Sequence, residues 1–103
     1  MKNRYPLEKL AEAVDFMATS DKGLGERIFG AYMGFYTIQL EHLPDRESQD
    51  RYKKLKEALT RFKAVGTEGD VLATLARLSS DELRDIAKQI VELRAYLEHV
   101  LSD

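Results

Sequence analysis

The last quarter of the chain carries the pattern that most restricts its fold. Its large apolar residues recur at alternating spacings of three and four, at Leu83, Ile86, Ile90, Leu93, Leu97 and Val100. Because an α-helix turns once every 3.6 residues, this spacing places them all on one helix face. Just before them, Ser79-Ser80-Asp81-Glu82 is typical of a capping box, which satisfies the first free amides of a helix. We therefore predict a long helix that begins at this box.

The rest of the chain repeats the helical period and shows no strand-like alternation. Pro6 favours a helix start, and Pro44 separates a helix over 24–43 from one that runs to Gly66. Asp70 is a candidate cap for a short helix. The expected core stripe of the third helix is Tyr52, Leu55, Leu59, Phe62 and Val65. We predict an all-α fold, a single domain over 1–103 that forms a compact bundle of four main helices plus one short helix.

Composition narrows the classes of protein further. A chain of 103 residues, 44% hydrophobic and 33% charged, supports one modest core. The absence of cysteine excludes disulfides, thiolate catalysis and cysteine metal sites. The longest uncharged apolar-rich run, 28–40, is shorter than the roughly 20 residues of a membrane-spanning helix. We expect a cytoplasmic protein without membrane contact.

The sequence offers no set of residues suited to catalysis or metal binding. His42 and His99 are the only histidines, and neither has the Glu-x-x-His spacing of helical metal sites. No nucleophile motif is present, and the carboxylates fall mostly on polar helix faces. We therefore expect no enzymatic activity, no cofactor and no metal.

The segment Gly30-Ala31-Tyr32-Met33-Gly34 has two glycines one helical turn apart, which lets helix backbones approach closely. Three interpretations are open: packing within the chain, a homodimer contact, or a ligand groove beside the glycines. Gly30, Tyr32, Gly34 and Tyr36 are our candidate interaction surface or groove. If the approach is close, Gly34→Leu should destabilise the fold or break a dimer.

Charge is unevenly distributed along the chain, although the net charge is only −2. Segment 46–63 has seven Lys and Arg against three Asp and Glu, a net charge of +4, whereas 79–103 carries −3. The candidates for anion contact are Lys53, Lys54, Lys56, Arg61 and Lys63. Oppositely charged residues four apart favour a solvated helix face over a nucleic-acid surface. The basic and acidic helices are expected to face each other within the fold or across a dimer.

The residues at helix boundaries and core positions in the second half of the chain resemble those of small uncharacterised all-helical bacterial proteins. The similar residues are Leu43-Pro44, Tyr52, Leu55, Ala58-Leu59-Thr60, Gly69, Thr74-Leu75, Leu78 to Glu82, Ile86-Ala87 and Ile90. The resemblance covers roughly 60 residues and implies a bacterial source, but no activity. From the residues we predict a protein-interaction or regulatory module that self-associates through helix faces. The alternatives are a binder of a small apolar or aromatic molecule and a weak nucleic-acid binder.

Overall fold

The computed structural model describes residues 3–66 and 69–102, and every regular element within them is helical. The elements are α1 (Tyr5–Thr19), α2 (Leu24–Phe35), a 3-10 turn (Leu40–His42), α3 (Arg46–Leu59), α4 (Asp70–Arg77) and α5 (Ser80–Val100). The all-helical class predicted from the sequence is thus confirmed. The starts of α1, α4 and α5 lie within one residue of those expected.

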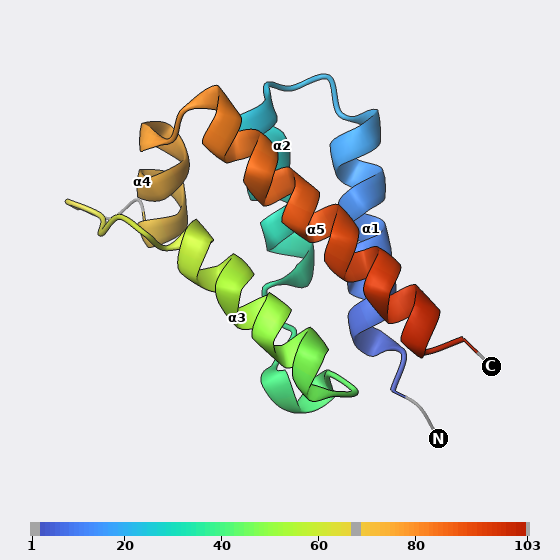
Figure 1. Cartoon of the computed structure of the whole chain (residues 1–103). Helices are drawn as coiled ribbons and strands as arrows, with labels where there is room; N and C mark the ends of the chain where they lie inside the picture. The colour runs from blue at the N-terminus through green and yellow to red at the C-terminus, as the bar shows by residue number, and fades with distance from the viewer. Residues whose placement is uncertain (1–2, 67–68, 103) are drawn as a thin grey trace.

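Helix α5 lies across the front of the molecule in Figure 1 and packs against α1, α2 and α3. Behind it, α2 stands between α1 and α4 and contacts both. The basic α3 and the acidic α5 therefore face each other within the fold, one of the two arrangements that their charges predicted. The start of α1 lies near the end of α5, where Arg4 donates a hydrogen bond of 3.0 Å to the carbonyl of Leu101.

One hydrophobic core joins all five helices. On α5 it takes Ile86, Ile90, Leu93 and Leu97, each at most 2% exposed. Burial of such a side chain contributes roughly 1.5–3 kcal/mol. The other helices contribute Leu7, Leu10, Ala13, Met17, Ile28, Ala31, Phe35, Tyr52, Leu55, Leu59, Val71 and Leu75. The helical spacing in the sequence therefore identified most of the core.

A capping box fixes the start of α5 as predicted, and a second one fixes the start of α3. At α5, the Ser79 amide donates to the Glu82 carboxylate (2.9 Å), and the Glu82 amide donates to the Ser79 hydroxyl (3.2 Å). At α3, the Ser48 amide donates to the carboxylate of Asp45 (2.8 Å). Because these amides have no partner inside the helix, each cap stabilises its helix by about 1 kcal/mol.

The prediction of one helix over 24–43 is wrong, because α2 ends at Phe35. The buried hydroxyl of Tyr52 donates to the carbonyl of Ile38 (2.8 Å) and that of Phe35 (3.3 Å). These carbonyls are thereby satisfied without a further helical turn. Ile38 then enters the core, and the Gln39 amide donates to His42 Nδ1 (2.9 Å), which starts the 3-10 turn.

The third helix is also shorter than predicted and ends at Leu59 instead of Gly66. Beyond it, the buried Thr74 of α4 exchanges two hydrogen bonds with the backbone of Phe62. These bonds hold the chain in an extended path beside α4. Phe62 is consequently only half-buried, and Val65 is 86% exposed, so Val65 is not a core residue.

The residue that caps α4 is not the predicted one. Gly69, with φ of 84°, occupies the cap position, where glycine tolerates a positive φ. Asp70 is the first helical residue, and its carboxylate accepts a hydrogen bond from the Ala64 amide (2.9 Å). Asp70 therefore holds the preceding loop instead of capping α4. Thr67 and Glu68 of the predicted connector lie outside the described residues.

Candidate interaction surface

The four residues chosen from the sequence occupy different environments on α2. The Phe16 ring of α1 covers Gly30 so closely that a Cβ there would overlap it. A Cβ on Gly34 would meet no atom within 4 Å. Tyr32 is half-buried, with its ring 5.7 Å from that of Phe35, whereas Tyr36 is 48% exposed. The tight packing expected of Gly34 within the chain is therefore wrong, and Gly30 alone shows it.

The side of α2 turned away from the core carries large apolar side chains. We define the outer face of α2 as Phe29, Met33 and Tyr36, which lie at spacings of four and three. Met33 is 51% exposed, and Phe29 is half-buried. In Figure 1, α5 crosses the opposite side of α2, where Ile28 and Phe35 are buried. Met33 and Tyr36 therefore stay about half exposed to solvent, whereas Phe29 packs partly against the core.

At the N-terminal end of this face lies the apolar groove, an open hollow of about 600 Å³ between α1, α2 and α4. Its walls are Phe16, Gly25, Phe29, Gly30, Leu72, Leu75 and Ala76, with Lys22 and Glu26 beside them. Phe16 and Leu72 are 43% and 41% exposed. Gly30 forms the groove by letting the Phe16 ring lie flat against α2.

At the C-terminal end lies the basic hollow, which has a volume of about 670 Å³. It is lined by Tyr36, Thr37, Ile38, Gln39, Leu40, Tyr52, Lys53, Lys56 and Glu57. The early end of α2 creates it, because the chain after Tyr36 turns across α3. Burial raises the pKa of Tyr52 to about 12, so this hydroxyl stays protonated and keeps its backbone acceptors.

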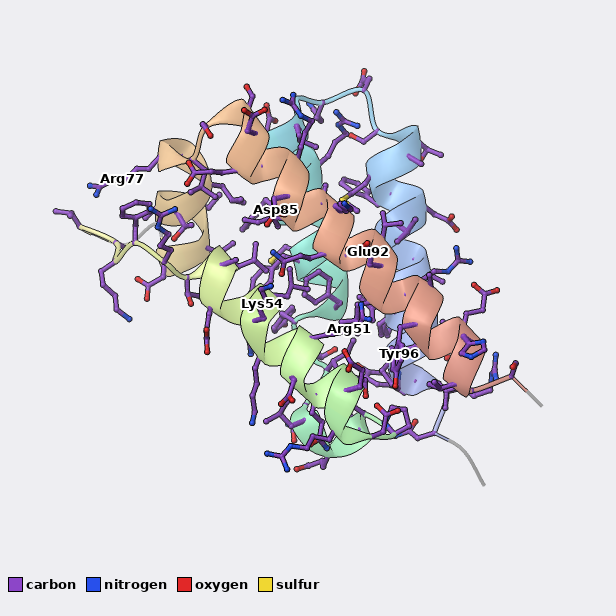
Figure 2. The ribbon with its side chains drawn as sticks, in the orientation of Figure 1. Arg51, Lys54, Arg77, Asp85, Glu92 and Tyr96 are labelled. Atoms are coloured by element: carbon purple, nitrogen blue, oxygen red, sulfur yellow. The ribbon has the colours of Figure 1, made fainter. Side chains whose placement is uncertain are left out.

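Of the five candidate anion contacts, Lys53 and Lys56 line the basic hollow. Neither forms an ion pair with any described carboxylate, although the Lys56 ammonium lies 5.5 Å from the centre of the Tyr52 ring. Lys54 lies on the other side of α3, next to Glu92 of α5 (Figure 2). These lysines thus serve two separate surfaces.

The remaining two candidates are engaged with carboxylates. Arg61 pairs with Glu82 of α5 (2.6 Å), and Lys63 pairs with Asp70 (3.3 Å). The hydrogen bond from the Ser79 amide, and after it the pairing with Arg61, lower the pKa of Glu82. Because the five cations are divided among several faces, they form no continuous stripe that could follow a phosphate backbone.

A second contact that the sequence did not predict joins α3 to α5. The Tyr96 hydroxyl donates to the carboxylate of Asp45 (2.5 Å), and the Arg51 guanidinium lies 4.9 Å from the centre of the Tyr96 ring (Figure 2). The Tyr96 hydroxyl and the Ser48 amide hold the pKa of Asp45 below its usual 3.8. The same hydrogen bond raises the pKa of Tyr96 to about 12. These groups join the start of α3 to α5.

Within 3–66 and 69–102, no three His, Asp or Glu side chains gather in a way that could hold a metal ion. His42 accepts the Gln39 amide and contacts the Tyr5 ring edge-on at 5.2 Å, whereas His99 lies in the last turn of α5. In the same ranges no helix is long and apolar enough to cross a membrane.

The sequence reasoning missed Phe16, Met33 and Leu72 as surface residues. Met33 and Leu72 belong to apolar helical stripes, so periodicity alone assigned them to the interior, whereas Phe16 lies outside the apolar stripe of the first helix. The excess of apolar residues on α2, which covers more of the helix than one core can bury, was the signal for Met33. Phe16 and Leu72 gave no comparable signal, because their exposure depends on where α1 and α4 pack.

Together these features define a small all-helical protein with an open apolar face between two hollows. No family model matches the chain. Comparison with curated proteins and with solved structures likewise finds no match.

Proposed function

We propose that this protein is a protein-interaction module that self-associates through the outer face of α2. In this proposal the chain folds as a bundle of four main helices plus one short helix, and it works in the cytoplasm. The observation that carries it is the row of Phe29, Met33 and Tyr36, left uncovered between two hollows. Covering an exposed apolar side chain contributes roughly 1.5–3 kcal/mol when the burial is complete.

The occupant proposed for this face is a second copy of the chain, because its exposed centre is apolar and the hollows at its two ends carry charges of both signs. Two copies related by a two-fold axis bring the same patch together, with the two α2 helices antiparallel. Each Met33 then lies near the axis, and each Tyr36 packs toward the partner's Phe29 end. Large aromatic and Met side chains at the centre of a contact are typical of protein interfaces.

The experiment compares the solution mass of three proteins by light scattering at the same concentration. The wild type should be a dimer, and Met33→Glu a monomer, because the substitution buries a charge at the centre of the contact. Val91→Glu is the matched control, since Val91 is 45% exposed but lies on α5. It should remain a dimer. A monomeric wild type, or equal loss in both variants, would overturn the proposal.

The apolar groove supports a second candidate, the binding of a small apolar or aromatic molecule. Its volume of about 600 Å³ falls within the roughly 300–1,000 Å³ of ligand sites, and its walls are largely apolar. For this candidate, decanoate should raise the melting temperature of the wild type. It should have no such effect on Leu72→Glu, which places a charge in the groove wall. Equal shifts in both proteins would rule out the groove.

A further inference from the structure

The two ends of the outer face of α2 carry different charges. Glu26 stands beside the apolar groove, whereas Lys53 and Lys56 stand in the basic hollow. None of the three forms an ion pair with a described residue. Each hollow also has one charge of the other sign, Lys22 in the groove and Glu57 in the basic hollow. The groove side is therefore neutral overall and the basic hollow carries +1, and the individual charges can pair, Glu26 with the two lysines and Lys22 with Glu57.

The antiparallel arrangement brings these unlike ends together. Glu26 precedes Met33 by seven helical residues, or about 10 Å along the axis, whereas α2 ends two residues after Met33, where Tyr36 lines the near edge of the basic hollow. With Met33 on the two-fold axis, Glu26 of one copy therefore lies opposite the partner's basic hollow. If the two α2 helices were parallel, the basic hollows of the two copies would lie side by side, and Lys53 and Lys56 of one copy would face the same lysines of the other.

We infer that Glu26 of one copy docks between Lys53 and Lys56 of a second copy, at both ends of a symmetric dimer. This inference rests on the proposed self-association and adds the orientation and register of the pair. Charges at the rim of an interface contribute little affinity, but they select partner and orientation, because facing like charges are strongly unfavourable. The two lysines are held for this role, since Lys56 packs on the Tyr52 ring and both stem from α3.

The test uses two charge-reversed proteins and their mixture. In Glu26→Lys, position 26 carries the same positive charge as the facing Lys53 and Lys56, and in the double variant Lys53→Glu with Lys56→Glu, positions 53 and 56 carry the same negative charge as the facing Glu26. Each protein alone should dimerise at least about tenfold more weakly than the wild type. Mixed in equal amounts, they should form a heterodimer, because both contact regions then pair opposite charges. Sedimentation velocity with one protein fluorescently labelled measures this directly.

Lys88→Glu is the matched control, since Lys88 is exposed on α5 and has no ion-pair partner among the described residues. It should dimerise as the wild type does. Circular dichroism of each variant checks that it is folded. A dimeric wild type whose reversed variants dimerise equally well, or whose mixture forms no heterodimer, would overturn the register and leave self-association standing. A monomeric wild type would overturn the self-association itself.

Discussion

Gly30 and Gly34 lie one turn apart on the same helix, yet their surroundings are opposite. The Phe16 ring fills the space over Gly30, and this contact offsets the roughly 1 kcal/mol that a glycine costs inside a helix. Above Gly34 there is open space, and nothing within the chain offsets its cost. A pair of glycines at this spacing is therefore two separate features, one that shapes the apolar groove and one beside the exposed Met33.

The largest expected difference in stability between the two positions comes from adding a bulky side chain at each glycine. Gly30→Leu should lower the free energy of unfolding by about 1–3 kcal/mol, because the Phe16 ring must leave its place. Gly34→Leu should leave it unchanged or slightly raised, since leucine favours helix more than glycine does. Urea unfolding of both variants, in a Met33→Glu background that removes self-association, makes the comparison. Equal destabilisation at the two positions would contradict it.

A smaller effect isolates the contact between Phe16 and Gly30. In the wild type, Gly30→Ala gains helix propensity but loses the packing of the ring, so the two effects oppose each other. In a Phe16→Ala background only the gain remains, and Gly30→Ala should raise stability as Gly34→Ala does. The double-mutant cycle should give a coupling of about 1 kcal/mol. Coupling near zero would mean that the ring does not rest on Gly30 in solution.

The smallest expected effect is a dependence of the free energy of unfolding on pH. Substitution of either glycine should leave this dependence unchanged. Since the pKa of Asp45 is lowered in the fold, its contribution is complete above 3.8 and is lost as the pH falls below that value. Tyr96→Phe removes the main cause of the lowered pKa, so its deficit in stability at pH 7 should shrink at pH 3. The gap between the glycine variants should be the same at both pH values. An unchanged Tyr96→Phe deficit would contradict the assigned hydrogen bond.

Local signals predicted much of the fold. Helical spacing and the capping boxes at Ser79 and Asp45 act over a few residues, so the sequence displays them directly. The ends of α2 and α3 depend on partners distant in the sequence, namely Tyr52 for α2 and Thr74 for α3. Neither side chain signals in the sequence which backbone group it will bond.

The candidate surface was predicted only in part, again because some of its features depend on residues that are distant in the sequence. The apolar excess on α2 pointed to an exposed face, and Tyr36 and Gly30 belong to the two hollows at its ends. Tight packing of Gly34 within the chain was one of three open interpretations and is wrong, because the spacing shows that a neighbour would fit and not that one is present. Lys53 and Lys56 line one hollow with Tyr36 because the chain turns after α2. The sequence did not predict this hollow, because it predicted a longer helix in place of the turn.

The cysteine-free sequence allows one direct test of whether two α2 helices pair. In the proposed dimer the single thiol of each Met33→Cys copy faces its counterpart at the two-fold axis, and a disulfide can form only if the two Cα atoms come within roughly 7 Å. Mild oxidation followed by a non-reducing gel should show nearly complete dimer for Met33→Cys and almost none for Val91→Cys on α5. Cross-linking that is equal in the two variants, or stronger at position 91, would contradict pairing through the outer face of α2.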